Sequence, residues 1–298
     1  MTIKNYKKIS AILTLALALL AFSYTSASAV RITPPRLVIG ADVKVQHMFI
    51  KNTSNQTESY RFSWKHLAMD KQGNILNLDK IGLENAPQGY RPLNDVIRFS
   101  PRRAVLKSGQ TQRVTFLVKR SAQLSDGEYR SHFLVQREPK KTNPVPNETP
   151  ASDAPQNTNE PASSPAVAVD VLISRAVPIY VLQGQTNAEL KLLNVEIKKN
   201  ANKTKPHQPD NLVHFKVQKT GNRSLIGIAS IYCDQNGKEV KISKASKVFA
   251  VYAEGEYRDE QVAVQIPSSG CNAYNIKITG HHDDPLAGKI LANQTFQK

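Results

Sequence analysis

The most regular pattern in the chain is an alternation of apolar and polar residues in short segments. Within the segment 167–181, a β-branched aliphatic residue occupies every odd position from Val167 to Ile173. A period of two places such side chains on one face of a strand. Pro178 lies in the same run and cannot donate a ladder hydrogen bond, which favours an edge strand. The segment is therefore predicted to be either an ordinary sandwich strand or an exposed edge that pairs with another chain.

Further short strands are predicted through the first half of the chain. Tyr60, Phe62 and Trp64 alternate with polar residues, and this aromatic row is expected to face a core. The odd positions from Val43 to Phe49 alternate in the same way and are also expected to face inward. The other strands of this half are predicted at 32–39, 97–106, 114–118, 129–135 and 167–181. About seven strands is the number typical of an immunoglobulin-like sandwich.

The same pattern continues from residue 188 to the end. Strands are predicted at 190–197, 212–218, 225–232, 248–252, 262–266, 274–278 and 290–291, with turn residues between them. No helical period persists for more than a turn or two after residue 29, so the expected fold is all-β. We predict two immunoglobulin-like β-sandwich domains in tandem, over 30–183 and 184–298. The polar break at 183–186 separates them, and the short connection would enclose a cleft.

Residues 1–29 have the pattern of a secretory signal peptide. Lys4, Lys7 and Lys8 precede an apolar run over 9–22, and Ala27 and Ala29 form a small-residue cleavage site. The mature chain is therefore predicted to begin at residue 30 and to be exported. An uncleaved interfacial anchor is the alternative. The apolar run is short for a membrane span and no second one follows, so no membrane insertion is expected.

The charge of the chain is strongly positive. Its formal net charge is +16, and removing the three lysines of residues 1–29, which contain no acids, leaves +13. Such an excess suggests nucleic acid, an anionic surface or an acidic partner. An exported chain without a recognisable nucleic-acid motif is not expected to bind nucleic acid. The basic residues are also scattered, which is typical of solvated strand faces.

A segment of different composition, 139–165, interrupts the first half. It contains seven prolines in 27 residues, no aromatic residue, and many Asn, Thr, Ser, Glu and Ala. Such a segment buries too little apolar surface to offset its ordering entropy, so we predict disorder. Either it is a tolerated insertion or it tethers the strand that follows it.

Catalytic motifs are absent from the sequence. There is no nucleophile elbow, zinc-protease motif or phosphate-binding glycine loop, so no enzymatic activity and no cofactor are expected. The run from His281 to Asp284 contains metal-binding residue types, but adjacent ligands in an Asp-Pro turn lack a spaced partner set. A solvated hairpin tip is the favoured interpretation, and no metal is expected.

The two cysteines, Cys233 and Cys271, are the only ones in the chain and both lie in the second predicted domain. An export signal would deliver them to an oxidising compartment, where a disulfide is expected. A redox or metal role for a pair this widely spaced is the weaker alternative. Closing a loop of about 40 residues would stabilise the domain by roughly 3–4 kcal/mol in the chain-entropy model.

Several short sequence motifs resemble those of one protein family and occur in the same order along the chain. They are Thr-Pro-Pro-Arg-Leu-Val-Ile at 33–39, Ser-Pro-Arg-Arg-Ala-Val-Leu-Lys-Ser-Gly-Gln-Thr-Gln at 100–112, Asp-Gly-Glu-Tyr-Arg-Ser-His-Phe at 126–133 and Gly-Asn-Arg-Ser at 221–224. On these motifs the chain resembles the PapD-like periplasmic chaperones of the chaperone–usher pilus pathway, and its archaic branch in particular. The insertion at 139–165 and the paired cysteines depart from the family pattern.

The resemblance implies a mechanism for the alternating strand. Chaperones of this family lend a strand to pilus subunits (pilins) whose immunoglobulin fold lacks one, and they release the subunit at an outer-membrane usher. The expected donor side chains are Val167, Val169, Val171 and Ile173. The expected partners are strand-deficient, β-rich pilin subunits and the usher, and the expected compartment is the periplasm.

The resemblance also implies a basic anchor for the carboxylate at the C-terminus of the bound subunit. Arg36 lies in the first motif, Arg130 lies in the 126–133 motif, and Arg175 continues the odd register of the donor residues. A guanidinium matches the two oxygens of a carboxylate and stays charged. Alternatively, each of the three makes an ordinary salt bridge worth under about 1 kcal/mol.

Two other classes of secreted β-protein stay open from the sequence. A structural pilus subunit or adhesin would carry its donor strand directly after the signal peptide, whereas the candidate strand here is internal. A hydrolase on a sandwich scaffold would need a convergent polar constellation, which the sequence does not contain.

Overall fold

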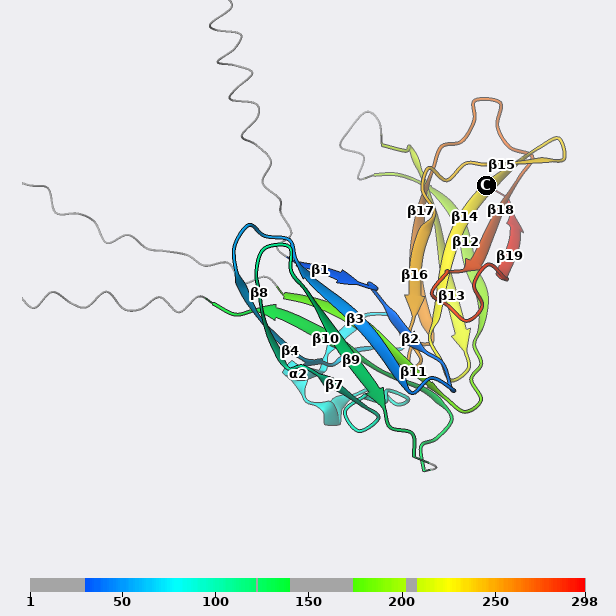
Figure 1. Ribbon diagram of the computed structural model, residues 1–298. Helices are drawn as coiled ribbons and strands as arrows, with labels where there is room; N and C mark the ends of the chain where they lie inside the picture. The colour runs from blue at the N-terminus through cyan, green and yellow to red at the C-terminus, as the bar shows by residue number, and fades with distance from the viewer. Residues whose placement is uncertain (1–29, 122, 140–173, 202–207, 298) are drawn as a thin grey trace, which may run out of the picture.

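A computed structural model describes residues 30–121, 123–139, 174–201 and 208–297. Within these ranges the chain forms two β-lobes that meet at an angle (Figure 1). The predicted signal peptide, almost all of the 139–165 segment, and Val167, Val169, Val171 and Ile173 lie outside the described residues.

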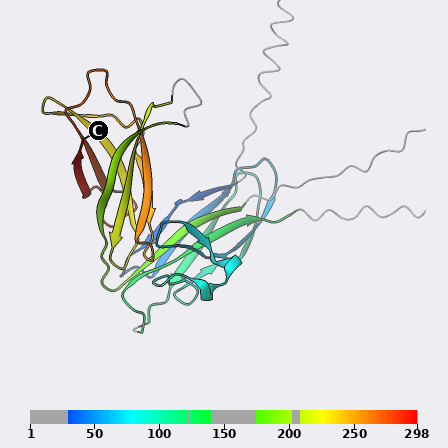
Figure 2. The same ribbon diagram turned by 180° about the vertical axis from the view of Figure 1, so that it is seen from behind.

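The first lobe is a sandwich of two sheets. One sheet has the order β1-β3-β9-β7, with bounds Val30–Thr33, Val45–Asn52, Thr111–Val118 and Ile97–Ser100. The other has the order β2-β11-β10-β4-β8, with bounds Leu37–Ile39, Ser174–Gln183, Gly127–Arg137, Glu58–Lys65 and Arg103–Leu106. The first of these sheets faces the viewer in Figure 1 and lies behind the second in Figure 2.

Aromatic rings fill the centre of this sandwich, as the Tyr60–Trp64 alternation predicts. Trp64 lies edge-on to Phe99 at 5.1 Å between ring centroids, and Phe116 lies edge-on to Phe133 at 5.2 Å. These four rings come from both sheets, so their contacts hold the two layers together. Edge-to-face geometry adds to the hydrophobic gain of burying such large side chains.

Two predicted single strands are each divided between the two sheets. The segment 32–39 forms the end of β1 in one sheet and β2 in the other, and 97–106 forms β7 and β8 in the same way. Prolines stand at both crossings, at Pro34, Pro35 and Pro101. Because proline cannot donate to the ladder, the pairing stops there and the chain passes to the opposite sheet.

The prediction that the odd positions from Val43 to Phe49 face inward was wrong. In β3 the even positions Met48 and Ile50 are buried, whereas Val45 and Phe49 are 45% and 44% exposed. Both rows of this strand contain apolar residues, so alternation alone did not distinguish the core face from the solvent face. Pairing with β9, whose Val114 is buried, decides the orientation.

The second lobe is also a two-sheet sandwich. One sheet has the order β12-β13-β17, with bounds Glu189–Lys199, Asn211–Thr220 and Tyr257–Val264. The other has the order β15-β14-β18-β19, with β16 also paired to β14, and bounds Lys238–Lys241, Leu225–Gln235, Ala273–Gly280, Ile290–Phe296 and Lys247–Val251. The expectation of an all-β chain with two immunoglobulin-like sandwiches is thus confirmed.

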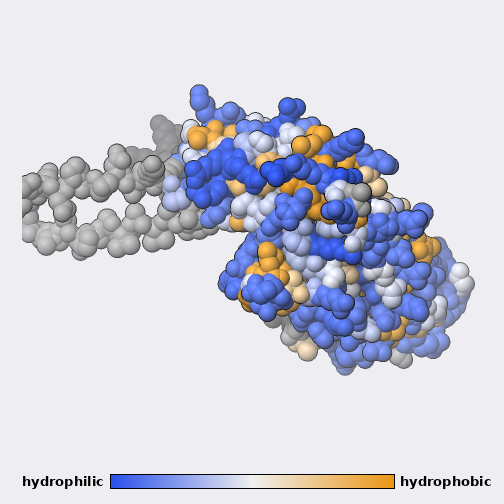
Figure 3. All heavy atoms as spheres, turned by 90° about the horizontal axis from the view of Figure 1, so that it is seen from below, coloured by the Kyte–Doolittle hydropathy of each residue, from blue (hydrophilic) through white to orange (hydrophobic). Residues whose placement is uncertain are grey.

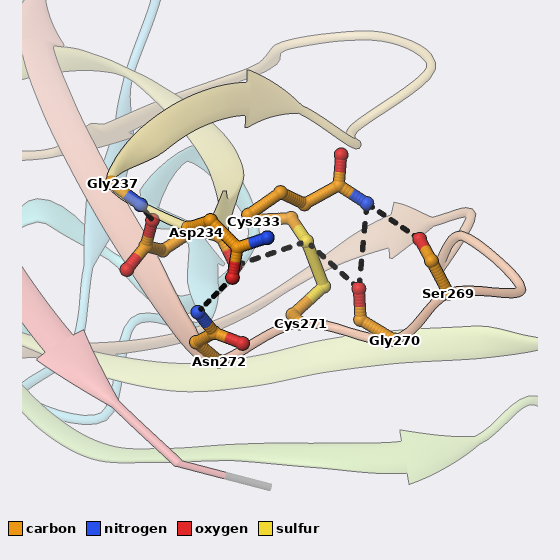
Figure 4. The surroundings of a disulfide bond; sticks show 9 residues. Cys233, Asp234, Gly237, Ser269, Gly270, Cys271 and Asn272 are labelled. Atoms are coloured by element: carbon orange, nitrogen blue, oxygen red, sulfur yellow. Dashed lines mark hydrogen bonds between the residues drawn. A yellow bond between two sulfur atoms is a disulfide. The ribbon is translucent and has the colours of Figure 1, made fainter.

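The predicted disulfide is present in the second lobe. Cys233 at the end of β14 is bonded to Cys271, with 5.4 Å between their Cα atoms (Figure 4). Gln235 donates to the hydroxyl of Ser269 beside it, and Asn272 donates its backbone N–H to the carbonyl of Asp234. The bond therefore closes one end of the sheet, where β14 and β18 lie side by side.

A segment between β4 and β7 was not predicted as an element. It contains β5 (Leu67–Met69), β6 (Ile75–Asn77), the one-turn helix α2 (Leu78–Ile81) and the 3-10 turn η1 (Leu83–Asn85). The β5–β6 hairpin reaches the second lobe, where Met69 is fully buried within the apolar cluster of that lobe. The backbone N–H of Tyr257 donates to the carbonyl of Lys71 in the hairpin turn. The two lobes are therefore joined by packing as well as by the chain.

Candidate functional site

Strand β11 has one paired edge and one half-open edge. It pairs antiparallel with β10 along its whole length, from Ser174 to Gln183. On its other side, β2 pairs with it only from Ile179 to Val181. Residues 174–178 therefore have no strand on their outer side within the described part of the chain. Pro178 is the last residue before the β2 pairing begins, which agrees with the edge position expected for a proline.

The two faces of β11 have different surroundings. Val177, Ile179 and Val181 are buried in the core of the first lobe. Alternation places Arg175 on the same face, and its Nη1 donates to the carbonyl oxygen of Val30 at 3.2 Å. Arg175 is thus located where β11 leaves the core, next to the first residue of β1.

Tyr180 and Leu182, on the other face of β11, lie against residues of the second lobe, where buried charges gather. Arg130 on β10 is the Cα partner of Tyr180 on β11, and its side chain is only 2% exposed. Its Nη2 donates to Oε1 of Glu254 at 2.5 Å, and its Nε lies 3.8 Å from Oε1 of Glu128. The guanidinium carbon also lies 3.5 Å from the ring centroid of Tyr252, a cation–π contact.

The pKa values of Glu128 and Arg130 are shifted by burial and by the attraction between their opposite charges. Burial raises the pKa of Glu128, although Arg130 and the hydrogen bonds from Ser224 oppose the rise. Burial acts to lower the pKa of Arg130, but the adjacent carboxylates of Glu254 and Glu128 outweigh it and raise that pKa. Arg130 therefore stays charged at the interface between the lobes.

More ion pairs and hydrogen bonds extend this network across the interface. Glu128 accepts from the backbone N–H and the hydroxyl of Ser224 at 2.7 and 2.5 Å. Nη1 of Arg223 lies 3.3 Å from Oδ1 of Asp284, and both residues are buried. The buried charged groups here, three acids and three bases, are Glu128, Glu254, Asp284, Arg130, Lys219 and Arg223. We call these six residues the interface network.

Arg36 makes a separate contact between the lobes. Its Nη1 donates to Oδ2 of Asp283 at 3.1 Å and lies 3.5 Å from Nδ1 of His281. The ligand-type atoms of His281, His282 and Asp283 all lie within 4.8 Å of one another, so the residue types suit a metal. The guanidinium of Arg36 already supplies a positive charge to the cluster. We therefore propose no metal at this position.

The expectation of a solvated hairpin tip at 281–284 holds for only one of its residues. His282 has a side chain that is 78% exposed, but the side chain of His281 is 12% exposed. Burial lowers the pKa of His281, and the adjacent His282 and Arg36 lower it further. The carboxylate of Asp284 accepts a hydrogen bond from the backbone N–H of Ile226 and also forms an ion pair with Arg223. The run is thus part of the contact between the lobes, which the sequence pattern did not indicate.

The three predicted anchors are engaged by three different groups. Arg36 pairs with Asp283, Arg175 contacts the carbonyl of Val30, and Arg130 is enclosed by Glu254, Glu128 and Tyr252. The side chain of Arg130 is only 2% exposed, whereas the side chain of Arg36 is 20% exposed. Two carboxylates of the protein itself already contact this guanidinium, one from each lobe.

One signal in the sequence could have indicated the pairing of Arg130. Glu128 and Arg130 are two residues apart, at the start of the predicted strand 129–135 and within β10, so their oppositely charged side chains lie on the same face. Glu254 follows the strand β16 in a loop of the second lobe, and its contact with Arg130 spans 124 positions of sequence. No local pattern relates residues so far apart.

A cleft is present where the β5–β6 hairpin approaches the second lobe. It has a volume of about 410 Å³ and is lined by Lys71, Gln88 and Gly89 from the first lobe and by 218–221 and 253–256 from the second. Burial lowers the pKa of Lys219 in its wall. The expected interdomain cleft is therefore polar on this side.

Comparison with known proteins gives only weak similarities. No protein-family model and no curated protein matches the chain. Among solved structures, the YadV chaperone is 10% identical, and the match covers 90% of this chain and 100% of that one with a TM-score of 0.45. A chain of the CsuC–CsuE chaperone–tip adhesion subunit pre-assembly complex from the archaic chaperone–usher Csu pili of Acinetobacter baumannii is 10% identical, with coverages of 90% and 98% and a TM-score of 0.44.

A third similarity is to a chain of the Salmonella enterica SafA pilin complex with the SafB chaperone. It is 12% identical, covers 91% of this chain and 97% of that one, and has a TM-score of 0.41. We base no functional conclusion on similarities at this level. The described residues also contain no helix that has the length and apolar character needed to cross a membrane.

Proposed function

We propose that this protein is a periplasmic chaperone that binds pilus subunits by donor-strand complementation and delivers them to an outer-membrane usher. The observation that supports it is the half-open edge of β11, whose residues 174–178 lack an outer strand partner within the described chain. The alternating aliphatic run from Val167 to Ile173 immediately precedes this edge in the sequence. Family motifs along both halves of the sequence support the same proposal.

The proposed interaction uses the backbone and the side chains differently. The open edge supplies N–H and C=O groups that pair with a strand of the subunit. Val167, Val169, Val171 and Ile173 fill the groove that the subunit leaves open between its sheets. Burying each of these side chains contributes roughly 1.5–3 kcal/mol before the costs of association.

Arg36 and Arg175 are the proposed anchors for the carboxylate at the subunit's C-terminus. The side chain of Arg36 is 20% exposed, and Arg175 is exposed at the end of the open edge. Guanidinium groups form paired, charge-assisted hydrogen bonds with a carboxylate. Arg130 is left out of this proposal because its charge is already balanced within the interface network.

The chain architecture is less suited to the alternative of a pilus subunit or adhesin. A subunit lacks a strand and leaves its core open, whereas both lobes here contain a closed apolar cluster between two sheets. We therefore favour the chaperone, which lends a strand and does not accept one.

Site-specific photo-crosslinking in the source bacterium tests the proposed function. A photoreactive amino acid placed at Val169 or Val171 is expected to give a covalent adduct with a small exported protein. Mass spectrometry of the adduct is expected to identify an immunoglobulin-like subunit that lacks a strand. The same group placed at Lys238, an exposed residue at the far end of the second lobe, serves as the control. If the photoreactive residues at 169 and 171 crosslink only within this protein or to a second copy of it, the proposal is contradicted.

The contact between Arg36 and Asp283 leads to a prediction about the affinity for the subunit's C-terminal carboxylate. Asp283 competes for the guanidinium that a subunit carboxylate would use, so Asp283→Asn is expected to raise the affinity for a C-terminal subunit peptide severalfold. Arg36→Ala is expected to lower it, and amidation of the peptide is expected to abolish the difference between the variants. Isothermal titration calorimetry measures all three. Equal affinity of the Asn variant and the unaltered protein would show that Asp283 does not compete.

A further inference from the structure

The outer face of the sheet β1-β3-β9-β7 carries a regular array of cations and apolar side chains. Strand pairing places Arg98, Leu117 and Val45 in one row across β7, β9 and β3. Two rows further along, Arg113 on β9 pairs with Phe49 on β3. Side chains directly opposite one another in such rows have Cβ atoms about 5 Å apart. Leu117 and Phe49 are therefore each next to an arginine, and Val45 lies beside Leu117.

The last row adds two more cations at the end of the same face. Lys51 on β3 pairs with Arg31 on β1, and both are exposed. The four cations Arg31, Lys51, Arg98 and Arg113 form no ion pair within the described residues, and no acidic residue lies on this face of the four strands. The rows extend over roughly 20 Å along the strands, from the repeat of about 3.4 Å per residue. We call this surface the cationic face.

The apolar side chains of the cationic face are open to solvent to a similar degree. Val45, Phe49 and Leu117 are 45%, 44% and 46% exposed. Val45 and Leu117 are neighbours in one row, but Phe49 lies two rows away beside Arg113, so the three do not form one continuous apolar patch. Figure 3, which views the molecule from below and not onto this face, shows apolar residues in small groups on a mainly hydrophilic surface there. Hydrophobic burial alone would therefore bind a partner weakly here.

We propose that the cationic face docks on an anionic phospholipid surface. A second copy of the chain is disfavoured as the occupant, because it would bring four unpaired cations against four others. An anionic bilayer complements the face over its whole area, since its phosphate groups lie in a plane at the depth that long basic side chains reach. The three apolar side chains would contact the boundary between headgroups and acyl chains, where phenylalanine and leucine are favourable.

This inference does not depend on the role of β11. The cationic face belongs to β1-β3-β9-β7, whereas the open edge belongs to the other sheet of the same lobe. Binding through this face would leave the open edge accessible. A membrane-docked protein would then meet exported chains close to the bilayer and not throughout the compartment.

Co-sedimentation of the exported protein with lipid vesicles tests the proposal. The protein is expected to bind vesicles of phosphatidylglycerol mixed with phosphatidylcholine and not vesicles of phosphatidylcholine alone. The double variant Arg31→Glu/Arg113→Glu is expected to lose at least about 100-fold in affinity, because each charge near an anionic surface changes binding about fivefold. Measurements at about 0.15 M salt limit the contribution of distant charges, since the Debye length is then about 8 Å.

A matched control separates this face from the general positive charge of the protein. Lys191 and Lys238 are exposed on the second lobe, and Lys191→Glu/Lys238→Glu makes the same change in net charge. This variant is expected to bind within about threefold of the unaltered protein, given the same screening length. A second pair on the face, Lys51→Glu/Arg98→Glu, is expected to reproduce the loss, and Phe49→Ser is expected to weaken binding severalfold with the salt dependence unchanged.

Four results would overturn the proposal. The first three are equal binding to neutral vesicles, an equal loss in the control variant, and retention of binding in both charge-reversed pairs on the face. The fourth is absence of binding to anionic vesicles by the unaltered protein, which would direct the search to an acidic protein partner.

Discussion

Replacing Arg130 with alanine is expected to destabilise the protein by about 3–5 kcal/mol, because it leaves buried carboxylates without their cation. Glu254 and Glu128 would lose the guanidinium that lies beside both of them, and with it one of the influences that oppose the burial-induced rise in the pKa of Glu128. The variant should therefore unfold at a clearly lower urea concentration. Trp64 is the only tryptophan and is located in the first lobe, so its fluorescence reports that lobe directly.

Two further variants make this expectation specific to the ion pair. Adding Glu254→Gln to Arg130→Ala removes one of the unpaired charges, so the double variant is expected to regain at least about 1 kcal/mol relative to the single one. Arg113→Ala removes an exposed arginine of the same lobe and is expected to change stability by under about 0.5 kcal/mol. A loss below about 1 kcal/mol for Arg130→Ala would mean that the buried pair contributes little.

Aspartates in place of Val169 and Val171 are expected to reduce subunit binding at least about a hundredfold. Each valine contributes roughly 1.5–3 kcal/mol when it is buried in the subunit, and a charge in the same groove adds a further desolvation cost. Recovery of the subunit partner from periplasm with tagged protein measures the effect. The free protein is expected to unfold at the same urea concentration as before, because the proposed contacts of these residues belong to the complex.

The opposite row of the same predicted strand provides the control. Ala168→Asp/Leu172→Asp introduces the same two charges at even positions, and alternation predicts that they face away from the subunit groove. This variant is expected to retain most of the binding. Equal loss from both rows, or unfolding of the free protein by Val169→Asp/Val171→Asp, would indicate that the row belongs to the protein's own core.

Much of the fold was predictable from local patterns. Alternation of apolar and polar residues identified most of the strands, and the aromatic row of Tyr60, Phe62 and Trp64 indicated the core of the first lobe. A strand has a side-chain period of two, so this signal needs only a few consecutive residues. The pairing of Cys233 with Cys271 was predictable for a simpler reason, since no other cysteine is available to either of them.

Tertiary structure decided which face of an ambiguous strand is buried and which charges meet. In β3 both rows contain apolar residues, so only pairing with β9 determined that Phe49 is exposed and Met48 is buried. Arg130 had the same predicted chemistry as Arg36 and Arg175, but in the folded protein it is buried against Glu254 of the other lobe. Hydrophobic periodicity is a local property of the chain, whereas the pairing of charges between two lobes depends on distances that only the packed structure defines.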